Sequence, residues 1–246
     1  MKSVLGIFLA SVLFLSSCTT TQIQESMGVL LGSGNTGVNN TEAASGLKEA
    51  LTKGFGTAIG LLSKEDGFYG NSLVKIPWPE EAAFVKNAME KIGMGGQVDK
   101  VTMSLNRAAE KASGEALSVF VDVIKQMTFQ DAMGILLGGD GAATDYLKRS
   151  TTIVLADRFR PIIESSLGDV NATKYWTDAI TVYNKIPLVN KKVNTDLTAF
   201  VTEKALQGVF LKVEEQENNI RNNLSFRSSP LLQKVFGFAD SKKATN

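Results

Sequence analysis

The sequence contains no histidine, and its only cysteine is Cys18 among 246 residues. These absences exclude catalytic triads that depend on histidine and zinc sites built from His or Cys. They also exclude internal disulfides, and they leave no cysteine in the body of the chain to act as a nucleophile. We therefore expect neither a metal site nor a bound cofactor.

An excess of charge of one sign is also lacking. Lysine and arginine together number 26, against 25 aspartate and glutamate residues, so the formal net charge is +1. Nucleic-acid-binding domains present a concentrated basic surface, and this balance predicts no nucleic-acid partner. The hydrophobic content of 43% is typical of a globular chain, long enough here for one domain with a sizeable core.

Long hydrophobic runs are absent as well. The run over residues 4–15 covers about a dozen residues, whereas a helix that spans a bilayer needs about 20. Its length is that of the apolar region of a signal peptide. It leads directly into Leu15-Ser16-Ser17-Cys18, which resembles a bacterial lipobox: an aliphatic residue, two small residues and the cysteine that receives the lipid.

This resemblance predicts that residues 1–17 are a lipoprotein signal peptide and that Cys18 carries acyl chains. The alternative is an ordinary secretory signal followed by a chance cysteine. Removal of residues 1–17 takes away one lysine, so the mature chain would have no net charge to attract anionic headgroups. Acyl chains would therefore provide the membrane attachment. Thr19 stands where an aspartate tends to retain lipoproteins in the inner membrane, which favours the outer membrane, on its periplasmic face or at the surface.

The remaining chain divides by composition. Residues 18–42 are rich in Thr, Ser, Gly, Asn and Gln, which predicts a flexible tether. Residues 43–238 carry the apolar periodicity of a folded domain, and residues 239–246 are expected to be a polar tail.

The periodicity of the domain is helical throughout. Apolar residues within 46–63 and 197–213 recur at the spacing of one buried helix face. No alternating strand-like run appears, and no Asn-Gly or Asp-Gly pair joins two such runs. The sequence predicts an all-α fold of about eight or nine helices in one domain.

Several helix boundaries can be placed from capping residues. Thr128 with Asp131 is a capping box that starts a short helix. The pair Gly138-Gly139 is expected to end that helix, and Asp140 to cap the next one, which Pro161 should kink or break. Glycines before a helix can also cradle a phosphate, but no strand precedes them and no Lys-Ser/Thr pair follows, as a P-loop requires.

One polar cluster is a candidate for a site. Its members are Asn106, Arg107, Asp122, Lys125 and Gln126. A tight Ser-Gly turn between two helices would bring Arg107 level with Asp122, so we expect these two to form a buried pair. Such a network either fixes helix packing or binds a ligand. The acidic residues Glu214, Glu215 and Glu217 are interpreted as a solvated face.

Aromatic residues at 78, 175 and 176 are expected to pack at the edges of the core, although a ligand slot is a second possibility.

From about residue 46 to 236 the chain resembles a family of uncharacterised bacterial envelope proteins, the domain-of-unknown-function family 4197. The segments that carry the likeness include residues 46–51, 71–77, 104–110, 127–136 and 201–206. The resemblance implies a helical domain on an exported chain. It implies no activity and no catalytic residues.

We therefore expect a non-enzymatic, lipid-anchored envelope protein whose helical domain binds another envelope protein or an apolar ligand. The alternative is a hydrolase or other enzyme that uses Asp, Glu, Lys, Arg or Tyr in place of His and Cys. A polar-lined cleft would favour the alternative.

Overall fold

The structure is a computed structural model, and it describes residues 38–169 and 196–243, together with residues 173, 176, 177, 180, 181 and 185 between them. The helices within these residues are α2 (Asn40–Leu62), η1 (Glu80–Ala82), α3 (Ala83–Lys91), α4 (Gly95–Ser113), α5 (Ala116–Gln126), α6 (Phe129–Leu137), α7 (Ala142–Gly168), α9 (Leu197–Asn222), η2 (Leu224–Phe226) and α10 (Pro230–Lys243). No strand occurs in this part of the chain, and the predicted all-α class is confirmed.

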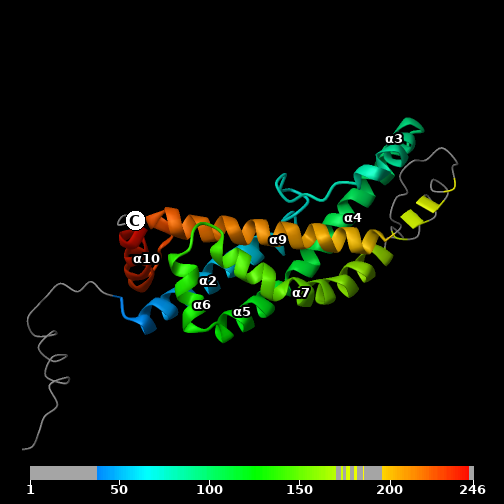
Figure 1. Ribbon diagram of the computed structural model, residues 1–246. Helices are drawn as coiled ribbons and strands as arrows, with labels where there is room; N and C mark the ends of the chain where they lie inside the picture. The colour runs from blue at the N-terminus through cyan, green and yellow to red at the C-terminus, as the bar shows by residue number, and fades with distance from the viewer. Residues whose placement is uncertain are drawn as a thin grey trace, which may run out of the picture. The chain divides into compact units, whose positions relative to one another are not determined.

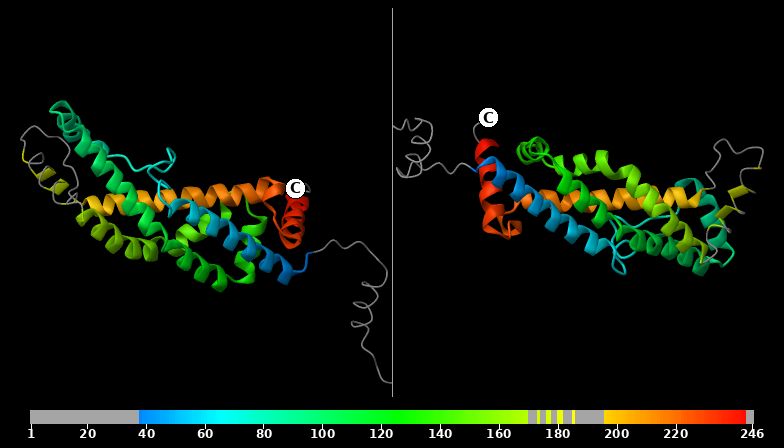
Figure 2. Two further views of the ribbon diagram at one scale, coloured as in Figure 1. Left: turned by 180° about the vertical axis from the view of Figure 1, so that it is seen from behind. Right: turned by 90° about the horizontal axis from the view of Figure 1, so that it is seen from below.

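Helix α9 is the central element of the core. It packs against α7, α2 and α4, and Figures 1 and 2 show it running beside α7 with α2 and α4 crossing it on another side. Its predicted apolar face is confirmed, because each member is buried: Leu197, Val201, Ala205, Val209 and Val213. A stripe at this spacing lets one helix bury against several neighbours at once.

Helix α2 begins earlier than the composition predicted. Asn39 is its N-cap and forms a capping box with Glu42, and the preceding Val38 is buried. The expected tether of residues 18–42 therefore extends too far, because its last residues belong to the domain. Residues 1–37, including Cys18 and the rest of the predicted tether, lie outside the described residues.

The capping box at Thr128 is confirmed, and α6 begins at the next residue. The N-cap of α7 is Gly141, with φ at 78°, and not Asp140 as predicted. A left-handed φ is accessible to glycine without steric cost. Pro161 does not end the helix, since α7 continues through it to Gly168.

The carboxyl-terminal boundary also differs from the prediction. Helix α10 runs to Lys243, so most of the expected polar tail of residues 239–246 is helical. Ala239 is buried, and Asp240 pairs with the buried Arg227 at 2.7 Å. Composition alone did not indicate that Ala239 is buried or that Asp240 forms an ion pair, and these two contacts attach the end of α10 to the rest of the domain.

Gly208→Ala is expected to destabilise the fold by about 1–3 kcal/mol, because a Cβ at this position in α9 would lie 2.6 Å from the ring of the fully buried Phe68. The matched control is Gly56→Ala in α2, where the new methyl meets nothing within 4 Å. That control should be neutral or stabilising by up to about 1 kcal/mol through helix propensity. Urea unfolding of both variants measures the difference, and equal stabilities would contradict the prediction.

None of the described helices has the length and apolarity that crossing a bilayer requires.

Candidate functional site

The predicted polar cluster is not assembled. Asp122, Lys125 and Gln126 have exposed side chains on α5, whereas Asn106 is fully buried in α4. The predicted pair of Arg107 with Asp122 is wrong, because the guanidinium bonds to carboxylates on α4 and on the loop after α2. The turn explains the difference. Gly114 and Glu115 keep helical dihedrals, so the chain leads onward from α4 into α5 and does not fold back (Figure 2).

Asn106 holds the extended segment before α3 against α4. Its Oδ1 accepts a hydrogen bond from the backbone N–H of Ile76 at 2.8 Å, and its Nδ2 donates to the carbonyl of the same residue at 2.9 Å. Nδ2 also donates to the carbonyl of Thr102 at 2.8 Å. One amide therefore satisfies both backbone groups of a residue that is itself buried. This is a packing role.

Glu110 secures the loop after α2 one helical turn further on. Its Oε1 accepts hydrogen bonds from the backbone N–H groups of Phe68 and Tyr69, at 3.0 and 3.1 Å. Its Oε2 accepts from Arg107 at 2.6 Å, and Arg107 also donates to Asp66 at 2.8 Å. The hydrogen bond to Glu110 raises the pKa of the Arg107 guanidinium above its ordinary value. Arg107 therefore stays charged and joins loop to helix.

Trp78 makes a further polar contact with α4, beside those of Asn106 and Glu110. Its Nε1 donates to the hydroxyl of Thr102 at 3.0 Å, and its ring packs on Trp176 with centroids 6.0 Å apart. Trp176 is buried, which confirms the expectation that these aromatics pack at a core edge; Tyr175 lies outside the described residues. Thr102, Asn106 and Glu110 are spaced four residues apart, so one face of α4 carries these three contacts, and the neighbouring Arg107 adds its ion pair with Asp66.

A second cluster was missed by the sequence analysis. Glu217 on α9 is buried, and its carboxylate accepts hydrogen bonds from the backbone N–H groups of Ala143 and Thr144, at 2.9 and 2.8 Å. Arg221 pairs with Glu217 at 2.8 Å and donates to the carbonyl oxygen of Ile135 at 2.8 Å. The pair therefore satisfies the last carbonyls of α6 and the first N–H groups of α7 together.

The solvated face predicted for Glu214, Glu215 and Glu217 is therefore wrong at its last member. One signal in the sequence points to it: Glu217 stands four residues after Val213, on the continuation of the buried face of α9. The same contact argues against a phosphate site formed by Gly138-Gly139 at the start of α7, because a carboxylate of the chain already occupies the amino terminus of that helix.

Arg227 forms a third internal cluster. It is buried, and it donates to the carbonyl oxygens of Ile220 and Arg221 at 3.1 and 2.6 Å. Its charge is balanced by Asp240 on α10. This arginine therefore fixes the turn between α9 and α10.

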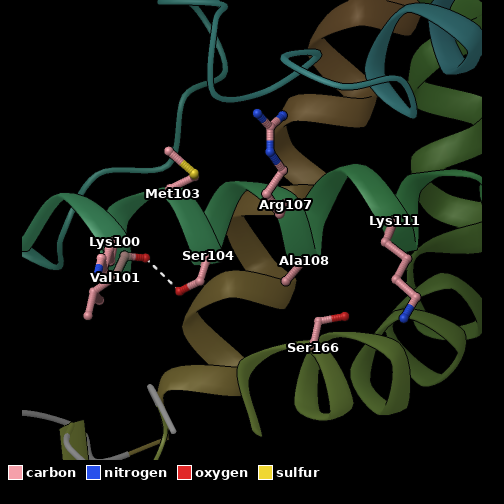
Figure 3. A pocket seen from close by; sticks show the side chains of 8 residues that line it. All are labelled: Lys100, Val101, Met103, Ser104, Arg107, Ala108, Lys111 and Ser166. Carbon is pink, nitrogen blue, oxygen red and sulfur yellow. Dashed lines mark hydrogen bonds between the residues drawn. The ribbon is translucent and has the colours of Figure 1, made fainter. Parts of the chain in front are cut away.

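Within the part of the chain that the structure describes, the hollow that best suits a ligand is a groove along α4, which we call the α4–α7 groove. It has a volume of about 420 Å³. Its lining residues are Lys100, Val101, Met103, Ser104, Arg107, Ala108, Lys111 and Ser166. Figure 3 shows Lys100 and Lys111 at its two ends and Ser166 rising from α7 toward α4. Of the predicted cluster, only Arg107 reaches it.

Two features of this groove stand out. Neither Lys100 nor Lys111 has a carboxylate within ion-pair distance among the described residues, and both are exposed. The hydroxyl oxygen of Ser166 is buried and has no hydrogen-bond partner in the part of the chain that the structure describes. Buried polar atoms are normally bonded, so an unpartnered one in a groove wall calls for an explanation.

Other hollows are less distinctive. One of about 420 Å³ lies between α7 and α9 and has Glu203 and Glu214 beside Lys148, so its charges are mixed. One of about 360 Å³ lies where the segment over residues 73–77 meets α9. The described residues contain no group of three or more acidic or cysteine side chains placed to hold a metal ion.

Neither a comparison with curated proteins nor one with solved structures found a significant match. A family model described as "Protein of unknown function (DUF4197)" matches residues 37–237, and this span contains the α4–α7 groove and the clusters around Glu110, Glu217 and Arg227, with the exception of Asp240. The match covers most of the chain and confirms the resemblance drawn from its motifs, so the protein belongs to this family of proteins of unknown function.

Proposed function

We propose that this protein is a bacterial envelope lipoprotein, attached to a membrane by acyl chains on Cys18, whose helical domain is a binding or structural module without catalytic activity. The attachment is supported by the lone cysteine at the end of a lipobox-like motif. The absence of an aspartate at position 19 supports the outer membrane as its location.

The observation that carries the non-enzymatic assignment is the use of the buried charges. Five charged side chains are buried among the described residues: Glu110, Lys212, Glu217, Arg221 and Arg227. Each is already bonded to backbone groups or to an opposite charge. A general acid or base has to lie within hydrogen-bond distance of the proton that it transfers. It must also be able to gain and lose that proton, which permanent ion pairs and hydrogen bonds oppose. Four of these side chains instead hold helices and loops together, and Lys212 is paired within α9.

Cys18→Ala is expected to abolish lipidation and to release the protein from membranes. The acyl chains provide the attachment in this proposal, because the chain without residues 1–17 has no net charge. Metabolic labelling with an alkyne fatty acid, followed by membrane fractionation, measures both effects. The matched control is Ser17→Ala, which keeps a small residue before the cysteine and should remain labelled and membrane-bound. A Cys18→Ala protein that stays with membranes after high-salt and carbonate washes would refute the lipoprotein assignment.

The binding role is tested separately by crosslinking in intact cells and identifying what co-purifies with the membrane-bound protein. A specific partner or bound lipid, lost after denaturation of the domain, is the expected result. Turnover of a substrate by the purified chain would contradict the proposal.

A further inference from the structure

We propose that the α4–α7 groove binds a single-chain anionic amphiphile, a free fatty acid, with its acyl chain along α4 and its carboxylate at a lysine. This inference rests on the proposed binding role and names the class of ligand.

The floor of the groove is built for an apolar chain. Residues at 100, 104, 108 and 111 share one face of α4, and the middle two are the small residues Ser104 and Ala108, both buried. Val101 and the exposed Met103 add apolar wall, and the stems of long basic side chains can cover more. The volume of about 420 Å³ falls at the lower end of the range for small-molecule sites, which suits one chain and not two.

The length of the groove gives the same answer. Lys111 follows Lys100 by eleven positions, and at 1.5 Å per residue the two lie about 16.5 Å apart along the helix axis. A single acyl chain of medium length fits that distance with its carboxylate beside one of the lysines.

The charged side chains that line the groove favour an anionic ligand. Three basic side chains, Lys100, Arg107 and Lys111, line the groove, and no carboxylate does. Arg107 is balanced by Glu110 and Asp66, whereas the two lysines have no such partner among the described residues. A bound carboxylate would complement a lysine and would also accept a hydrogen bond from the unpartnered hydroxyl of Ser166.

The backbone argues against an extended peptide as the occupant. Both walls of the groove are helices, whose interior N–H and C=O groups are bonded within the helix. An extended peptide would find no backbone partners there, whereas peptide recognition of this kind depends on main-chain hydrogen bonds. An acyl chain needs none.

The test uses the full chain with Cys18→Ala, so that no acyl group of its own competes. Dansyl-undecanoic acid is the fluorescent probe, and dodecanoate, neutral dodecanol and cationic dodecyltrimethylammonium are competitors below their micelle concentrations. We expect saturable probe binding, displaced best by dodecanoate, with the advantage over dodecanol reduced at high salt. Equal displacement by all three, or no saturable binding, would overturn the proposal.

Two variants locate the site. Lys100→Gln with Lys111→Gln should weaken dodecanoate binding by about five- to tenfold and leave dodecanol unchanged, as expected for exposed charges. Lys91→Gln with Lys243→Gln removes the same charge outside the groove and should change neither. Ser104→Leu fills the floor and should weaken both ligands, with folding checked by circular dichroism. Unchanged dodecanoate binding in the lysine variant would overturn the assignment, even if Ser104→Leu fails to fold.

Other outcomes separate the occupant from the anchoring. Displacement of the probe by an acidic amphipathic peptide, without displacement by dodecanoate, would show a protein partner and refute the fatty acid. Membrane release of Cys18→Ala does not depend on the groove. A failure of fatty-acid binding together with that release would therefore reject the ligand while leaving the lipoprotein assignment in place.

Discussion

Glu217→Ala is expected to lower the free energy of unfolding by about 3–5 kcal/mol. The substitution leaves the guanidinium of Arg221 buried without its carboxylate, since both side chains are 3% exposed or less. It also removes the acceptor for two backbone N–H groups at the start of α7. Arg221→Ala should have a comparable effect, because it strands the carboxylate and the terminal carbonyls of α6.

Chemical denaturation of Glu217→Ala gives this energy, and Glu214→Ala is the matched control on the same helix. Glu214 lies 4.0 Å from Lys148, and the two side chains are 41% and 43% exposed. Exposed pairs contribute about 1 kcal/mol or less, so the control should lose no more than that. Similar losses in the two variants would show that the buried pair does not join α6, α7 and α9 as described.

Asn106→Leu should destabilise the protein by about 2–4 kcal/mol, although leucine has the branching and the number of side-chain heavy atoms of asparagine and suits a helix. The amide now satisfies the buried N–H and carbonyl of Ile76, and each group left unpaired costs about 1–3 kcal/mol. The segment before α3 should loosen locally. Amide hydrogen exchange at Ile76 is expected to become much faster, because its N–H then has no acceptor.

The matched control for Asn106→Leu is Asn222→Leu at the end of α9. The Asn222 side chain is exposed and makes one hydrogen bond, to Asp140 at 3.1 Å. Its replacement should cost less than about 1 kcal/mol and leave the exchange of Ile76 unchanged. Slow exchange at Ile76 in the Asn106 variant would mean that other contacts hold this segment.

These two predictions concern the scaffold that positions the α4–α7 groove. The stripe of Thr102, Asn106 and Glu110 fixes α4 to the loop, and the neighbouring face with Ser104 and Ala108 forms the groove floor. One helix thus carries both a closed polar contact and an open apolar surface. Because the polar stripe is fully bonded within the chain, the groove face is the part of α4 left for a ligand.

Local features of the sequence were sufficient for the fold class and for much of its framework. The buried face of α9 and the capping box at Thr128 were both predicted and confirmed. Periodicity and capping are properties of residues within one or two helical turns, so they can be read without knowing what packs against a helix. The motifs of the family were legible for the same reason, since they are short contiguous segments.

Only the tertiary structure decided where the charges go. The backbone partners of Glu217, Ala143 and Thr144, stand 74 and 73 positions earlier in the chain. The partners of Arg107, Glu65 and Asp66, stand 42 and 41 positions earlier. Which residues become partners over such separations depends on how the helices cross. Because Gly114 and Glu115 keep helical dihedrals, α5 continues away from Arg107. A carboxylate on a polar stretch of sequence looks solvated until a helix amino terminus is placed against it. The groove likewise exists only because α7 lies beside a face of α4 that carries small residues between two lysines.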